Sequence, residues 1–208
     1  MSYAEPSSEP EPTALWLGID YTTSPKFVFV IEVSNEVFRS IGELTSLRHL
    51  SVYDADFADD DLSLLSGLTE LRQLALNKAR VTDLGCLHLR RMGRLEHLGL
   101  NKSMIGDEGV KHLTSLTTIT ELSLCETLVT DMGLRHLQHL PHLEVLWLDE
   151  TAVTDTGLTH LLACKRLKKV SLNKTAVTDL GISRFHEQHP KCSVAWSGGE
   201  YFPFDSGS

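Results

Sequence analysis

Aspartate recurs six times at 24-residue intervals, and this row of carboxylates is the first feature of the chain that could do chemistry. Carboxylates in register could hold a row of metal ions. However, each aspartate directly precedes a segment with helical spacing, where it can accept backbone N–H bonds and complement the helix dipole. We therefore predict that the row caps helices. Its members are Asp59, Asp83, Asp107, Asp131, Asp155 and Asp179.

Histidine forms a second row with the same interval, at His88, His112, His136 and His160. Zinc needs nitrogen ligands about 2.0–2.1 Å away. Neighbouring helices have diameters of ~10–12 Å and so sit roughly 10 Å apart, too far for two of these residues to share a metal. We interpret them as repeat positions on a half-exposed face, and pH sensitivity between about pH 5 and 8 remains an alternative.

Two other groupings also favour structural interpretations. His186, His189 and Cys192 have zinc-binding side chains, but Pro190 ends the helix between them and no fourth ligand is evident. The run Asp54–Asp61 lacks the glycine and glutamate spacing of a Ca²⁺ loop, and we interpret it as a solvated acidic edge. The chain contains no GxSxG, GxxxxGK or HExxH motif. We expect no metal, no cofactor and no enzymatic activity.

The elements that position these residues follow from the period itself. A repeat of 24 residues without insertions indicates a solenoid, in which each unit buries its apolar face against its neighbours. In each unit, L-x-x-L-x-L opens a short strand, a turn leads to the aspartate, and a short helix follows. The six units begin at Leu47, Leu71, Leu95, Ile119, Leu143 and Leu167.

Residues 44–196 follow the pattern LxxLxLxxTxVTDxGLxxLxxL, which resembles the leucine-rich repeat superfamily. The VTDxGL variant is similar to repeats of bacterial leucine-rich proteins and to the cysteine-containing repeats of F-box proteins. The resemblance implies an α/β horseshoe with parallel strands on its concave face and short helices on its convex face, and a protein that binds other proteins. The family's Asn or Cys position holds Ala55, Ala79, Ser103, Thr127, Thr151 and Thr175.

The segments outside the repeats are expected to close the array. A capping strand and helix are predicted because Lys26–Val33 is β-branched and aromatic and Phe38, Ile41 and Leu44 have helical spacing. The ending HPKCSVAW resembles the closing strand of such bacterial proteins. The expected organisation is a disordered acidic tail at 1–13, the cap at 14–46, six repeats at 47–190, a closing strand at 191–197 and an aromatic tail at 198–208.

Bulk properties narrow the classes of partner. The formal charge of −9 disfavours nucleic acids and anionic membranes, which attract basic surfaces. Four cysteines without a CxxC pair favour buried thiols in a reducing compartment. The acidic N-terminus lacks the features of a secretory signal, and no run of about 20 apolar residues occurs. A cytoplasmic protein is expected, and the oligomeric state stays open.

Strand residues between the buried leucines must face outward, in columns, because side chains alternate along a strand. The first column is His49, Gln73, His97, Glu121, Val145 and Lys169. The central column is Ser51, Ala75, Gly99, Ser123, Trp147 and Ser171. The third column is Tyr53, Asn77, Asn101, Cys125, Asp149 and Asn173.

Trp147 is the one large residue of the central column and is the predicted anchor for a partner. Packing against Tyr201, Phe202 and Phe204 of the aromatic tail is the alternative. Repeats four and five are acidic and would select a basic segment, and asparagines would form hydrogen bonds. The acidic residues are Glu121, Glu126, Glu144, Asp149 and Glu150. The predicted partner-binding residues are Tyr53, Asn77, His97, Asn101, Glu121, Cys125, Val145, Trp147, Asp149, Lys169 and Asn173.

These observations predict a non-catalytic module that binds a protein or peptide on its concave face. A structural or assembly subunit that uses its edges or tails is the alternative. A substrate receptor for a ubiquitin ligase is a variant suggested by the resemblance, but residues 1–46 contain no evident F-box helices.

Overall fold

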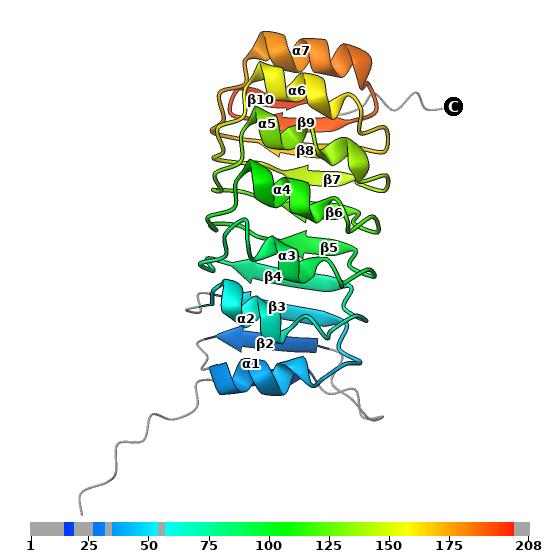
Figure 1. The fold of residues 1–208 in the computed structure, drawn as a ribbon. Coiled ribbons are helices and arrows are strands. Elements are labelled where there is room, and N and C mark those ends of the chain that lie inside the picture. The colour runs from blue at the N-terminus through cyan, green and yellow to red at the C-terminus, as the bar shows by residue number, and fades with distance from the viewer. Residues whose placement is uncertain (1–14, 19–26, 32–34, 54–56, 202–208) are drawn as a thin grey trace, which may run out of the picture.

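The computed structural model describes residues 15–18, 27–31, 35–53 and 57–201 (Figure 1). Side chains are described from residue 36 onward, except those of Tyr53 and Tyr201. The tail expected at residues 1–13 and most of the aromatic tail, including Phe202 and Phe204, lie outside the described residues.

Within the described ranges, ten strands form one sheet in chain order. β2 to β9 are parallel, and β1 and β10 add antiparallel strands at the two ends. The parallel ladder keeps a constant 24-residue register between repeats. The strands are β1 Leu15–Gly18, β2 Phe27–Ile31, β3 His49–Tyr53, β4 Gln73–Asn77, β5 His97–Gly99, β6 Glu121–Ser123, β7 Val145–Trp147, β8 Lys169–Leu172, β9 Ser193–Trp196 and β10 Gly199–Tyr201.

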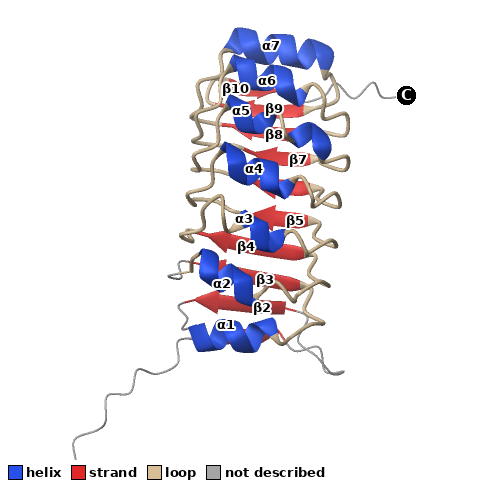
Figure 2. Cartoon of the chain, in the orientation of Figure 1, coloured by secondary structure: helices blue, strands red, loops and turns tan. Residues whose placement is uncertain are grey.

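Short helices lie on the opposite side of the solenoid from the strands (Figure 2). The structure confirms the predicted α/β solenoid of parallel strands and short helices. The helices are α1 Asn35–Gly42, α2 Asp59–Leu64, α3 Cys86–Leu89, α4 Asp107–Leu113, α5 Asp131–Leu134, α6 Asp155–Leu161 and α7 Asp179–Gln188, with a 3-10 turn at Leu137–His139.

Apolar repeat positions fill one continuous core between the strands and the helices. In the third repeat, Leu95, Leu100 and Ile105 are fully buried. At the N-terminal end, Phe38 of α1 packs edge-on against Phe57 of the first repeat, with ring centroids 4.6 Å apart. Each repeat therefore gains its stability from its neighbours, as a solenoid requires.

The aspartate row joins adjacent repeats instead of capping its own helices. Asp107 Oδ1 accepts a hydrogen bond from Thr130 N at 2.8 Å, and Asp107 Oδ2 accepts one from Thr130 Oγ1 at 2.7 Å. Thr130 caps α5 by accepting from Met132 N at 3.2 Å. The predicted helix-capping role is therefore wrong, because the N-cap is the residue before the aspartate, Gly106 for α4 and Thr130 for α5, and the Asp107 carboxylate binds the next repeat. The same pair of hydrogen bonds joins Asp59 to Thr82, Asp131 to Thr154 and Asp155 to Thr178.

This bridge explains the glycine two residues after the aspartate. A Cβ atom on Gly133 would lie 2.6 Å from Asp107 Oδ1, and one on Gly109 would lie 2.5 Å from Asp83 Oδ1. Both distances are shorter than van der Waals contact, so a larger residue would displace the carboxylate. The Asp-x-Gly spacing is thus the imprint of one repeat packing on the next.

The first repeat has Asp61 at the glycine position. Its carboxyl is buried, and Asp61 Oδ2 accepts a hydrogen bond from Ala58 N at 2.9 Å. The expected solvated acidic edge is therefore wrong at Asp61, which satisfies the start of α2, and at Asp59, which binds Thr82. Residues 54–56 of that run lie outside the described residues.

Candidate binding site on the strand face

The outward columns of the strand face lie in register across the repeats. Gly99 pairs with Ser123, and Ser123 pairs with Trp147, so three central-column residues lie side by side on β5, β6 and β7. Along each strand, the leucines that alternate with the outward residues are buried, as Leu98 and Leu122 illustrate. The alternation therefore delivers one small, one polar and one large aromatic residue to the same surface.

A hollow of about 140 Å³ opens on the N-terminal side of Trp147. Small central-column residues lie at its base, and Trp147 is its one large aromatic side chain. A cavity of roughly this volume accepts a group the size of benzene. The hollow can therefore receive one apolar or aromatic side chain. It is lined by Gln73, Leu74, Ala75, His97, Leu98, Gly99, Glu121, Ser123 and Trp147.

Polar groups border the hollow along the first column. His97 Nδ1 lies 3.0 Å from Glu121 Oε2, an ion pair when the imidazole is protonated. Ser123 Oγ donates to Asn101 Oδ1 at 2.6 Å, which turns the hydroxyl toward the third column. The lining thus combines an apolar base and wall with a rim that can form hydrogen bonds.

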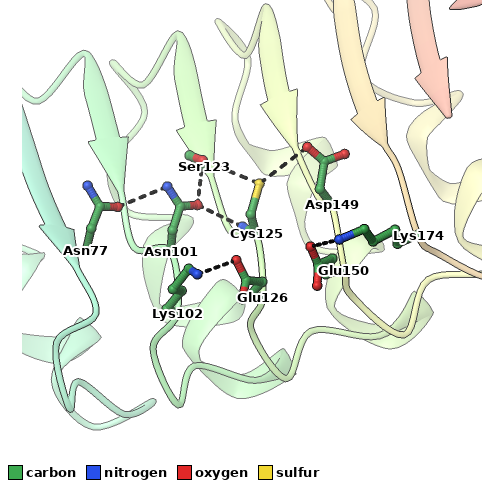
Figure 3. Close-up of polar contacts among 9 residues, drawn as sticks. All are labelled: Asn77, Asn101, Lys102, Ser123, Cys125, Glu126, Asp149, Glu150 and Lys174. Atoms are coloured by element: carbon green, nitrogen blue, oxygen red, sulfur yellow. Dashed lines mark hydrogen bonds and ion pairs between the residues drawn. The ribbon is translucent and has the colours of Figure 1, made fainter. Parts of the chain in front are cut away.

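The third column is engaged in hydrogen bonds within the chain (Figure 3). Asn101 Nδ2 donates to Asn77 Oδ1 at 2.9 Å, and Cys125 N donates to Asn101 Oδ1 at 2.8 Å. The Cys125 thiol, half-buried, lies 3.8 Å from Asp149 Oδ2. Burial raises the pKa of this thiol. These residues, which were predicted to contact a partner, therefore form hydrogen bonds between neighbouring repeats.

Asp149 accepts two short hydrogen bonds from the next repeat. Its Oδ1 accepts from Asn173 N at 2.6 Å and from Ser171 Oγ at 2.6 Å. Asn173 Nδ2 in turn donates to Ser171 Oγ at 3.1 Å. A substitution at Asp149 consequently breaks a bond between repeats, and cannot report on partner binding alone.

The carboxylates expected to select a basic partner are already paired inside the chain. Glu126 lies 2.9 Å from Lys102 Nζ. Glu144 contacts Lys168 at 2.5 Å and Arg166 at 3.1 Å, and these cations lower the pKa of its carboxyl. The acidic character predicted for repeats four and five is therefore compensated locally.

The remaining predicted site residues differ in what they offer. Val145 is half-buried beside Trp147 in β7, and Lys169 is exposed on β8. Tyr53 lies at the end of β3, but its side chain lies outside the described residues. Tyr201 pairs through its backbone with Val194. The alternative that the aromatic tail covers Trp147 stays a hypothesis.

The sequence predicted that Trp147 faces outward but did not predict the space beside it. The hollow extends from repeat two to repeat five, with Gln73 and Ala75 at one end and Trp147 at the other. Gln73, Ala75 and Gly99 line it and were absent from the predicted site. The signal that could have found them is the run of small residues in the central column, since small side chains leave room next to a tryptophan.

The groups of His, Cys and Asp residues noted in the sequence are not arranged as metal ligands among the described residues. Across the described residues, no group of three or more His, Cys, Asp or Glu side chains is arranged to hold a metal ion. Cys192 is buried, and the His189 ring stacks on Phe185 with centroids 5.3 Å apart. No described helix combines the length and the apolar composition needed to cross a bilayer.

No protein-family model matches the sequence, and no curated protein matches it either. Solved structures do match. An internalin (inlF) of Listeria monocytogenes is 21% identical with a TM-score of 0.56, over 76% of this chain and 49% of that chain. Internalin C2 of the same organism is 20% identical with a TM-score of 0.60, over 83% and 80% of the two chains.

A leucine-rich-repeat protein of Leptospira interrogans is 21% identical with a TM-score of 0.61, over 74% of this chain and 38% of that chain. The present chain thus spans about half of the inlF structure and less of the Leptospira one. These likenesses show that the chain has the fold of leucine-rich-repeat proteins.

Proposed function

We propose that this chain is a non-catalytic interaction module that binds a protein or peptide segment on its strand face. One apolar or aromatic side chain of the partner inserts beside Trp147, over Ala75 and Gly99. The observation that carries the proposal is the hollow of about 140 Å³ with a tryptophan as its wall. Tryptophans next to a desolvated pocket are typical centres of binding energy.

The predicted basic segment takes a secondary role in this proposal. The formal charge of −9 favours encounter with a basic partner over a distance. Local pairing of Glu126 with Lys102 and of Glu144 with Lys168 leaves less charge for direct contact. We therefore expect positive charge on the partner to raise the association rate more than it lengthens the lifetime of the complex.

A reducing compartment, such as the cytoplasm, is part of the same proposal. The four cysteines are free, and three of them are buried in the core. Burial raises the pKa of the Cys86 and Cys192 thiols to about 12. Such thiols behave as small apolar side chains and suit a protein that is not built around disulfides.

The test is selection of peptides from a random displayed library on the wild-type protein, followed by affinity measurement with variants. Trp147→Ala removes the wall of the hollow, and Gly99→Val fills its base. Gly99 accepts a Cβ at ordinary contact distances of 3.7 Å, so the strand tolerates this change. Ala195→Val is the control, since it places the same valine side chain on β9, two strands beyond Trp147.

We expect selected peptides to share one large apolar residue. Their affinity should fall at least tenfold with either Trp147→Ala or Gly99→Val, in line with about 2 kcal/mol for a central aromatic contact. Ala195→Val should bind as the wild type does. Equal binding by all four proteins would overturn the proposal and favour the alternative of an assembly subunit that uses its edges or tails.

A further inference from the structure

Exposed apolar side chains recur in the segments that lead from the strands into the helices. Among the described side chains, five large apolar residues are at least half exposed, and each follows a strand and precedes or begins a helix. Met104 and Leu128 occupy the same position in adjacent repeats, with 50% and 65% of their surface exposed. The other three are Leu84, Met132 and Leu180.

The turn after each strand presents alternate side chains to solvent. In the third repeat Lys102 is exposed, Ser103 is buried and Met104 is exposed. In the fourth repeat Glu126 is exposed, Thr127 is buried and Leu128 is exposed. The charged residue and the apolar residue of each turn therefore face outward on the same edge.

The charged residue of each turn changes from lysine to glutamate between repeats three and four. Repeats two and three carry Lys78 and Lys102, and repeats four and five carry Glu126 and Glu150 at the same position. Repeat six carries Lys174 there, with its Nζ 2.7 Å from Glu150 Oε1. Figure 3 shows Lys102, Glu126 and Glu150 in one row past the strand ends, with Lys102 Nζ 2.9 Å from Glu126. Met104 and Leu128 lie in the two turns that flank the midpoint.

The backbone gives an independent reason to examine this row. Lys78, Lys102, Glu126 and Glu150 all have φ between 55° and 60°, the left-handed region that glycine and asparagine adopt most easily. A long charged side chain in this conformation costs about 1 kcal/mol or more at each position. Their charge order is thus not what the turn itself requires.

We propose that this edge, defined by Lys78, Lys102, Met104, Glu126, Leu128 and Glu150, binds a second copy of the same chain about a two-fold axis. The axis passes between repeats three and four. Lys102 of one copy then faces Glu126 of the other, Lys78 faces Glu150, and Met104 packs against Leu128.

A two-fold axis is the arrangement that this charge order permits. It makes the interface isologous, so each contact occurs twice. The Lys102–Glu126 pair of one copy faces the reversed pair of the other, and four charges alternate in sign without breaking the existing ion pair. Parallel edges in the same register would place lysine on lysine and glutamate on glutamate, which is repulsive.

The size of the edge sets the strength of the contact. Four repeats spaced by ~4.8 Å give a surface roughly 15–20 Å long, which is shorter than an interface that buries the standard ~800 Å² per partner. We therefore expect a weak dimer that dissociates as salt screens the exposed charges. The strand face stays accessible in this dimer. The proposed dimer therefore does not depend on the proposed binding function of the strand face.

The test exploits charge reversal in two separate chains. Lys102→Glu should prevent self-association, because four glutamates then meet at the axis, and Glu126→Lys should do so with four lysines. An equimolar mixture of the two variants should associate, since each edge now meets its opposite. Sedimentation velocity of the full chain at about 10 to 500 µM and low ionic strength measures this.

Arg72→Glu is the matched control, because Arg72 forms an exposed inter-repeat ion pair with Glu96 at 2.7 Å where the chain enters its strands. It should leave the sedimentation of the dimer unchanged. Leu128→Ser should weaken association at least several-fold while circular dichroism stays that of the wild type.

Wild-type protein that remains monomeric at 500 µM in low salt overturns the proposal. So does a dimer that survives both single charge reversals, since it must use another surface. A mixture of Lys102→Glu and Glu126→Lys that associates no better than either variant alone also overturns it.

Discussion

The central column and the third column of the strand face differ in how they use their polar groups. Both columns face outward from the same strands, and both contain residues suited to contact a partner. The third column forms hydrogen bonds from repeat to repeat, such as Asp149 to Asn173. The central column instead leaves an open hollow beside Trp147. Outward orientation therefore does not by itself make a residue available for binding.

The largest effect is expected where a polar bridge between repeats is removed without touching the strand face. Asp107→Ala removes both hydrogen bonds to Thr130 and leaves its backbone N–H without an acceptor. Hydrogen bonds to charged groups contribute about 1.5–3 kcal/mol. We expect the free energy of unfolding in urea to fall by about 2–3 kcal/mol.

Asp60→Ala is the control for this substitution. Asp60 also begins a helix, but its side chain is exposed. Its removal should change the free energy of unfolding by less than about 0.5 kcal/mol. Equal losses in both variants would contradict a specific role for the bridge.

The second prediction compares the two columns directly. Asp149→Ala should lower the free energy of unfolding by about 1–3 kcal/mol, because Asn173 N and Ser171 Oγ lose their acceptor. Trp147→Ala should lower it by less, since the indole is only half-buried and faces solvent. Urea unfolding of both variants measures the difference, and a larger loss with Trp147→Ala would invalidate the division between the columns.

The third prediction compares the buried thiols of the core with Cys125, the half-buried thiol of the third column. Burial raises the pKa of Cys86 to about 12 and that of Cys164 to about 11, from 9.0 in the unfolded chain. The unfolded state therefore releases these protons first as the pH rises. Stability is complete below pH 9 and falls above it, by at most about 1.4 kcal/mol per pH unit and thiol.

Urea unfolding between pH 7 and 11 measures this dependence. Cys86→Ala should flatten it relative to the wild type, whereas Cys125→Ala should flatten it less because Cys125 is only half-buried. In the folded protein at pH 8, a disulfide reagent should modify Cys125 before the three buried thiols. Faster reaction at Cys86 would show that the core opens locally.

The repeat period predicts the fold well because it is a local pattern that neighbouring copies reinforce. Strand alternation also placed Trp147 on the correct face. The sequence could not show that Asp107 binds Thr130 of the next repeat, since an aspartate at the start of a helix is equally compatible with capping that helix. Nor could it show that Glu144 is neutralised by Lys168, because that pairing depends on side-chain geometry between repeats.

The last prediction tests whether the turn after each strand depends on its backbone conformation or on its charged side chain. Lys78 has φ 60°, where a β-branched residue is strained and glycine is not. Lys78→Val should lower the free energy of unfolding by about 1–2 kcal/mol, whereas Lys78→Gly should change it by less than about 0.5 kcal/mol. Urea unfolding at low protein concentration measures both. If glycine serves the turn as well as lysine does, the charge at this position contributes nothing to the fold, and its function must lie in what the edge contacts. A large loss with Lys78→Gly would instead assign the lysine to the stability of its own repeat.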